Sequence, residues 1–253
     1  MAARCGFADG QYQYGDCLYS GIGVPKNIEQ ALIWYQRAID QGHVGAIGSM
    51  AVCFQTGNGM EGEKDIEEAL KWFQSAADTN AGLATAECNL GILYDVGAEG
   101  IQPDPEKAVK YYRKAAIKGD LTAKCNLAVC YHNGIGVPED KEEAVKWWRQ
   151  SAEGGYAPGQ YNLGVCYQNG LGVRPNKEEA FKWYKLAAEQ GDQSAMQNLA
   201  WAYKMGFGTP RNEELAIHWL AKQQQIESGG QPSGLTDEDE EPEQVQSKAC
   251  VLL

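Results

Sequence analysis

The final four residues, Cys250-Val251-Leu252-Leu253, carry the plainest chemical motif of the chain. A cysteine followed by two aliphatic residues and a terminal Leu has the C-a-a-X form that prenyltransferases modify, and Leu at the end favours a geranylgeranyl group. One lipid chain binds membranes only weakly, and Lys248 is the one basic residue nearby. The motif therefore predicts geranylgeranylation of Cys250 and reversible, partner-assisted attachment to the cytoplasmic face of a membrane.

A second pattern is a column of asparagines that recurs every 36 or 37 residues, at Asn89, Asn126, Asn162 and Asn198. Each amide offers donors and an acceptor, so a ladder of them on one face could bind the backbone of an extended partner peptide. The same amides could instead bond to carbonyls of neighbouring helices and hold the structure together. Both interpretations remain open on the sequence, and alanine substitution would separate them.

The other reactive side chains favour packing over chemistry. No Cys-x-x-Cys pair is present, and Leu or Ala replaces one recurrent cysteine position in other repeats, as a packing site allows. That position holds Cys17, Cys53, Cys130, Cys166, Leu93 and Ala202. His43, His132 and His218 are scattered, and the glycine-containing turns lack the frame of a phosphate loop. We therefore expect no catalytic residue, metal, cofactor or small-molecule substrate.

Charge and hydropathy narrow the classes of partner. A formal net charge of −12 argues against nucleic acid, because phosphate binding requires clustered Lys and Arg. No apolar run is long enough to span a bilayer, and the first residues, Met1-Ala2-Ala3-Arg4-Cys5, lack the apolar segment of a secretion signal. These features predict a cytoplasmic protein with reduced cysteines.

The elements that must position these residues follow from an internal repeat. Two columns run in step through the chain: the first glycine of a turn, and an Ala followed three residues later by an aromatic residue. The glycines are Gly21, Gly57, Gly97, Gly134, Gly170 and Gly206. The aromatic residues are Trp34, Trp72, Tyr111, Trp147, Trp183 and Trp219.

Each repeat has the pattern of two helices. Ala123, Leu127 and Tyr131 are spaced by four, which is typical of a helical stripe rather than a strand. A helix-capping Asn or Asp precedes each second helix, and these caps are Asn27, Asp65, Asp104, Asp140, Asn176 and Asn212. Because one hairpin cannot bury both faces of its helices, we expect the hairpins to stack, with the recurrent Trp and Tyr filling the gaps between them.

The stretch from Asn162 through Gly191 resembles the Sel-one-like repeat, a relative of the tetratricopeptide repeat. The resemblance implies an all-α fold, a right-handed superhelical solenoid of about six antiparallel helix-pair repeats. Applied to this chain, it divides residues 1–227 into repeats near 7–43, 44–81, 82–120, 121–156, 157–192 and 193–227. Residues 228–249, which are Gly-rich and then acidic, predict a disordered linker before the C-a-a-X box at 250–253.

The resemblance implies an adaptor or scaffold that binds proteins through a concave face lined by the first helices of the repeats. The leading hypothesis is a non-enzymatic scaffold with a reversible lipid anchor. An activator or localiser of a membrane enzyme, similar to prenylated chitin synthase regulators, is an alternative. A hydrolase and a quality-control adaptor of the secretory pathway are weaker alternatives, because no nucleophile–base pair and no signal peptide are evident.

Overall fold

The computed structural model describes residues 7–57, 65–79, 83–97 and 100–227, and this part of the chain contains twelve α-helices. They are α1 (Ala8–Ser20), α2 (Ile28–Ile39), α3 (Val44–Thr56), α4 (Ile66–Ala77), α5 (Ala84–Val96), α6 (Pro105–Ile117), α7 (Leu121–Asn133), α8 (Lys141–Glu153), α9 (Ala157–Asn169), α10 (Lys177–Glu189), α11 (Gln193–Met205) and α12 (Glu213–Glu227).

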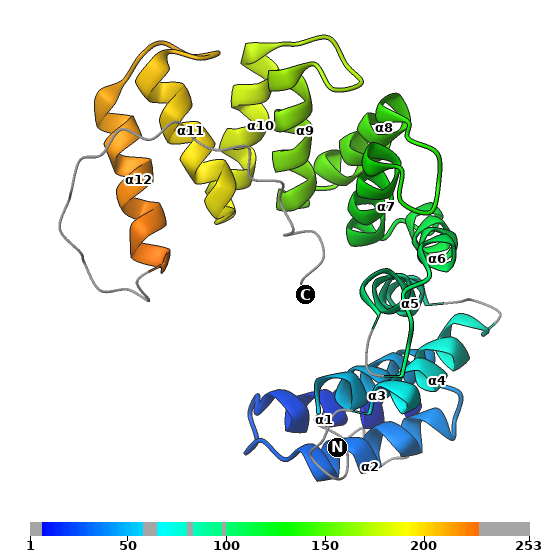
Figure 1. The fold of residues 1–253 in the computed structure, drawn as a ribbon. Coiled ribbons are helices and arrows are strands. Elements are labelled where there is room, and N and C mark those ends of the chain that lie inside the picture. The colour runs from blue at the N-terminus through cyan, green and yellow to red at the C-terminus, as the bar shows by residue number, and fades with distance from the viewer. Residues whose placement is uncertain (1–6, 58–64, 80–82, 98–99, 228–253) are drawn as a thin grey trace. The chain divides into compact units, whose positions relative to one another are not determined.

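The helices pack as consecutive pairs, from α1 with α2 to α11 with α12 (Figure 1). The chain forms two compact units, Met1–Asp120 and Leu121–Leu253, so each unit contains three of these pairs. Within each unit, the second helix of one pair also packs on the first helix of the next.

The predicted helix caps are confirmed. Each second helix begins with an Asn or Asp side chain that accepts a hydrogen bond from the backbone N–H three residues later, at 2.8–3.0 Å. The bond satisfies one of the N–H groups that a helix start leaves without a partner. Glycine ends several first helices in the left-handed conformation, for example Gly170 with φ 70°, where a side chain would be strained.

The deepest core position is the residue immediately after the predicted aromatic column. Most of that predicted column, from Trp34 to Trp183, is only half-buried, whereas the next residue is almost fully buried. The buried residues are Tyr35, Phe73, Tyr112, Trp148 and Tyr184. Each of these residues lies four positions after the recurrent Ala of its repeat, one turn further along the same face of the helix. The residues of the predicted column pack against these cores as partly buried side chains, and Trp72 contacts the core clusters of two neighbouring pairs.

Glycine makes room for three of these buried rings. A Cβ atom at Gly15 would lie 2.7 Å from Cε1 of Tyr35, and one at Gly164 would lie 2.7 Å from a ring carbon of Tyr184. Their hydroxyl groups reach polar partners, with Tyr35 donating to Asp16 at 2.7 Å and Tyr184 donating to Gln168 at 2.7 Å. Each ring therefore fixes the position of a polar side chain on the first helix of its own pair.

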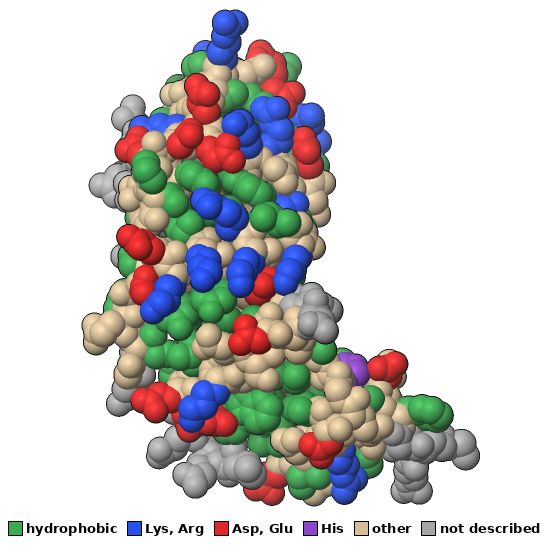
Figure 2. Space-filling view, turned by 90° about the vertical axis from the view of Figure 1, so that its right-hand side faces the viewer, with side chains coloured by type: hydrophobic (Ala, Val, Ile, Leu, Met, Phe, Trp, Pro, Cys, Tyr) green, Lys and Arg blue, Asp and Glu red, His purple; other side chains and the backbone are tan. Residues whose placement is uncertain are grey.

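Figure 2 shows one face of the molecule, on which basic and acidic side chains are interspersed with apolar ones. The displayed face thus carries no broad field of a single sign, of the kind that nucleic-acid binding requires.

Candidate functional site

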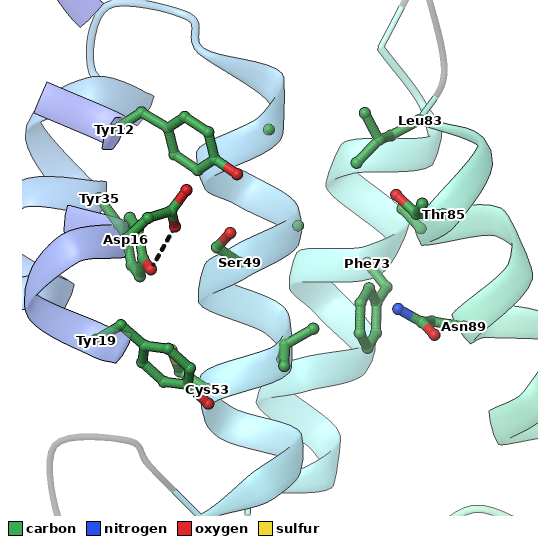
Figure 3. A pocket seen from close by; sticks show the side chains of 14 residues that line it. Tyr12, Asp16, Tyr19, Tyr35, Ser49, Cys53, Phe73, Leu83, Thr85 and Asn89 are labelled. Atoms are coloured by element: carbon green, nitrogen blue, oxygen red, sulfur yellow. Dashed lines mark hydrogen bonds between the residues drawn. The ribbon is translucent and has the colours of Figure 1, made fainter. Parts of the chain in front are cut away.

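A groove of about 420 Å³ lies in the first unit, along the first helices α1, α3 and α5 (Figure 3). Aromatic and polar side chains from α1 line one end, and Leu83, Thr85 and Asn89 line the other. The lining also includes Ser49, Val52 and Phe73.

At the α1 end, two phenols converge on one carboxylate. Tyr35 donates to Oδ1 of Asp16 at 2.7 Å, and the Tyr12 hydroxyl lies close enough to Asp16 and Ser49 for both to influence its pKa. Burial, followed by the hydrogen bond and charge of Asp16, raises the pKa of Tyr35 far above its ordinary value. Burial also raises the pKa of Tyr12. Both phenols therefore stay protonated at neutral pH, and Tyr35 acts as a donor that holds the carboxylate in place.

The α5 end contains Asn89, whose amide makes no hydrogen bond to any residue in the described segments. Gly48 also lines this end, where it contributes no side chain. In the register of the repeat, Gly48 holds the place of Tyr12 in the first pair and Tyr161 in the fifth. A side chain there would contact Leu83, since a Cβ at Gly48 would lie 3.0 Å from Leu83 Cδ2.

The repeat positions that Gly48 and Asn89 occupy lie close together in other pairs of the chain as well. The Tyr12 hydroxyl lies close enough to Ser49, the residue that stands in the asparagine column of the next pair, for Ser49 to influence its pKa. In the second unit, Asn162 donates to Cys125 Sγ at 3.6 Å. Asn198 lies close enough to the hydroxyls of Tyr161 and Tyr184 to influence the pKa of each. The groove exists at Asn89 because the preceding pair offers a glycine where the others offer a side chain.

The four predicted ladder residues therefore lie in different surroundings. Asn89 lines the groove, whereas Asn162 bonds to Cys125 and Asn198 lies next to Tyr161, each in the preceding pair of the same unit. Asn126 is only 3% exposed, and its amide atoms make no hydrogen bond within the described ranges. Asp16, Tyr12 and Gly48 were missed by the sequence analysis, although aligning the repeats shows Gly48 as an exception in its column.

The cysteines and histidines contribute no reactive centre among the described residues. Cys53, Cys88, Cys125, Cys130 and Cys166 are buried. Burial raises the pKa of Cys53 to about 11 and that of Cys166 to about 12, which disfavours the nucleophilic thiolate. Burial, with the nearby charge of Lys141, lowers the pKa of His132, whose ring contacts Trp148 at a centroid distance of 5.3 Å.

Cys250 and the linker 228–249 lie outside the described residues, so the predicted lipidation site stays a prediction. Within the described part of the chain, no helix has the length and hydropathy required to cross a bilayer.

Comparison with curated proteins finds regulators and binders of other proteins. The chain is 35% identical over 136 residues to the rat protein DAP3-binding cell death enhancer 1, covering 54% of this chain and 26% of the rat protein. It is 26% identical over 138 residues to chitin synthase regulatory factor 3 of Schizosaccharomyces pombe, covering 53% and 15% of the two chains. The matched segment thus spans less than a third of either relative.

A solved Sel1 repeat protein from Oxalobacter formigenes is 32% identical, with a TM-score of 0.75 over 93% of this chain and 87% of that one. This likeness confirms the predicted fold class, an all-α solenoid of helix-pair repeats. The Sel1 repeat model matches six segments, residues 8–43, 46–79, 84–120, 122–156, 157–192 and 193–222. Together they span most of the sequence, and the chain belongs to the Sel1 repeat family.

Proposed function

We propose that the chain is a non-enzymatic scaffold whose groove in the first unit binds an extended segment of a partner protein. The observation that carries this proposal is the Asn89 amide, which lines an open groove without a hydrogen-bond partner in the described residues. An extended peptide has unpaired N–H and C=O groups, and one amide side chain can bond to both. Sel1 repeat proteins are typically protein-interaction scaffolds, which agrees with this use of the groove.

The chemistry of the groove supports binding rather than catalysis. Its thiol, Cys53, has a pKa raised by burial, and its phenols Tyr12 and Tyr35 hold their protons. Asp16 accepts a hydrogen bond from Tyr35, so one of its lone pairs is occupied in orienting the site. A nucleophile paired with an adjacent base is the arrangement that catalysis by these residue types would require.

Affinity purification with the full chain as bait, as wild type and as Gly48→Tyr, tests whether the groove is the docking site. The new ring would occupy the groove and place a hydroxyl near Asn89, as Tyr161 does for Asn198. We expect the proteins that co-purify with the wild type to be lost, with the melting temperature kept within a few degrees. Unchanged co-purification from a folded Gly48→Tyr variant would contradict the proposal.

We propose further that Cys250 carries a geranylgeranyl group that places the scaffold reversibly at the cytoplasmic face of a membrane. The support is the sequence Cys250-Val251-Leu252-Leu253, which has the C-a-a-X form with a Leu in the last place. Because a single lipid gives only marginal membrane affinity, the protein partner would supply the remaining attachment.

Fractionation of cells that express the wild type or Cys250→Ser tests the anchor. The wild type is expected to divide between membrane and soluble fractions, and Cys250→Ser to move to the soluble fraction. Leu253→Ser is a useful companion, because a terminal Ser favours farnesylation over geranylgeranylation and keeps the cysteine. An identical distribution of wild type and Cys250→Ser would rule the anchor out.

A more specific version is that the scaffold activates or localises a membrane enzyme. The match to chitin synthase regulatory factor 3 favours this version, although it covers 15% of that protein. Co-purification of a membrane enzyme that is lost in both Gly48→Tyr and Cys250→Ser would support it, whereas an exclusively soluble partner set would contradict it.

A further inference from the structure

We infer that the α1 end of the groove is a subsite for a positively charged side chain, arginine in preference to lysine, on the segment that the scaffold binds. This inference rests on the proposed function, because it specifies the class of segment that the groove takes. It is carried by Asp16, by the tyrosines around it and by the apolar surface next to it.

Asp16 is the one charged residue among those that line the groove. It forms no ion pair with any residue of the described ranges, whereas other carboxylates of the same unit do. Asp9 lies 3.3 Å from His43, and the buried Glu87 lies 2.7 Å from Lys118. A half-buried carboxylate without a cation is costly to desolvate further, so an incoming cation is the complement that this end of the groove lacks.

The geometry around Asp16 leaves room for that cation. A carboxylate offers about four lone-pair positions, and the hydroxyl of Tyr35 occupies one of them. This hydrogen bond holds the carboxylate in position, because the Tyr35 ring is nearly fully buried and cannot move when a ligand binds. A preorganised carboxylate with free lone pairs suits the planar, two-pronged guanidinium group better than an ammonium group.

Aromatic rings next to the carboxylate strengthen the preference for arginine over lysine. Tyr12, Tyr19 and Tyr35 all line the groove beside Asp16 (Figure 3). Lys26 Nζ already lies 5.7 Å from the centroid of the Tyr19 ring, which shows that a cation is accommodated at this ring. Arginine stacks on tyrosine faces while its N–H groups bond to a carboxylate, so both contacts can form together.

The neighbouring surface predicts what accompanies the cation. Val52, Phe73 and Leu83 are apolar residues of the groove lining, and Figure 3 shows Phe73 next to Asn89. An aliphatic side chain close to the arginine would cover this apolar surface, and Asn89 would bond to the peptide backbone. The formal net charge of −12 raises the local concentration of basic segments and speeds their association.

The test uses pools of acetylated and amidated nonapeptides with one fixed central residue and degenerate flanks. The fixed residue is arginine, lysine, citrulline or glutamate, and citrulline keeps the shape of arginine without its charge. Retention on the immobilised full chain is measured at physiological ionic strength. We expect the arginine pool to be retained about tenfold better than the citrulline pool, as a charge-assisted hydrogen bond implies, with lysine between them.

Asp16→Asn is the decisive variant, because the amide oxygen can still accept the hydrogen bond from Tyr35. Its matched control is Asp95→Asn, which removes the same charge from a carboxylate that accepts a hydrogen bond from Tyr112 at 3.2 Å and lies outside the groove lining. We expect the preference for arginine over citrulline to disappear in Asp16→Asn and to persist in Asp95→Asn.

The outcomes separate this inference from the proposed function. If Gly48→Tyr abolishes retention while wild type and Asp16→Asn show the same arginine preference, the charged subsite is wrong and the groove remains a docking site. If Asp95→Asn loses the preference as well, the effect is the overall charge of the chain, and the subsite is again wrong. If Gly48→Tyr retains every pool as the wild type does, both the groove and its subsite are overturned.

Discussion

In the first unit, Asn89 of the asparagine column faces a glycine, Gly48, of the preceding pair. In the second unit, the asparagines of the same column face a tyrosine or a cysteine of the preceding pair. Asn89 therefore lines a groove, while Asn198 lies next to the hydroxyls of Tyr161 and Tyr184, and Asn162 bonds to Cys125. The repeat position is the same, and the side chain in the preceding pair decides whether its amide is available to a ligand. In a repeat protein, recognition can thus arise where one unit lacks a contact that the others make.

Tyr161→Ala should give the largest effect on stability, because it removes the ring that Asn198 meets. Tyr161 is buried within the core cluster of the second unit, with its ring 6.0 Å from that of Tyr184. We expect a loss of about 3–5 kcal/mol in the free energy of unfolding, measured by urea denaturation. The equivalent Tyr12→Ala should cost clearly less, because Tyr12 already borders an open groove. Equal losses at the two positions would contradict the difference between the units.

Gly48→Tyr makes the first unit resemble the second and should have the largest effect on binding. The added ring is expected to lower peptide retention by at least tenfold, because it would replace contacts that otherwise bind the peptide. Stability is expected to fall by about 1–2 kcal/mol, because Leu83 must shift to accept a Cβ that would lie 3.0 Å from its Cδ2. An X-ray structure of this variant that shows the Asn89 amide bonded to the new hydroxyl would extend the comparison to atomic detail.

Modification of thiols compares the two units at another shared repeat position. Burial raises the pKa of Cys53 to about 11 and that of Cys166 to about 12. A raised thiol pKa keeps the neutral form, so at pH 8 both should react with a thiol reagent at least about a hundredfold slower than an ordinary exposed cysteine. The same shifts predict that stability falls as the pH rises above the unfolded thiol pKa, because only the unfolded chain then releases these protons. Rapid labelling of Cys53 in the folded chain, detected by mass spectrometry, would show that the groove exposes it.

Ser49→Ala should give the smallest effect. It removes one polar group beside the Tyr12 hydroxyl, which still has Asp16 nearby. We expect a loss of about 0.5–1 kcal/mol in thermal or urea unfolding. A larger loss would mean that Ser49 organises the α1 end of the groove more strongly than the contacts indicate.

Much of the fold could be predicted from the sequence because its local rules repeat. The caps at Asn27 and Asp140 and the glycine at Gly170 act within a few residues of chain, where capping and left-handed geometry decide the outcome. The burial of the aromatic residues was harder to predict, because Trp147 and Trp148 are both large and apolar. Trp148 is buried because it lies one turn above Ala144 on the face toward the first helix.

The site was less predictable because it depends on pairs of residues in different repeats. The asparagine column could be read from spacing, but the partner of each amide lies in the preceding helix pair. Asp16 carried no pattern, since it has no acidic counterpart at its position in the other repeats. Its importance follows from Tyr35, whose hydroxyl reaches it across the pair.

The central claim is that Asn89 serves a ligand and Asn198 serves the fold, and paired alanine substitutions test it most directly. Peptide retention and thermal unfolding are measured for both variants of the full chain. We predict that Asn89→Ala loses retention at an unchanged melting temperature. Asn198→Ala should keep retention while its free energy of unfolding falls by about 1–2 kcal/mol. The reverse pattern, or the same change in both variants, would contradict the account.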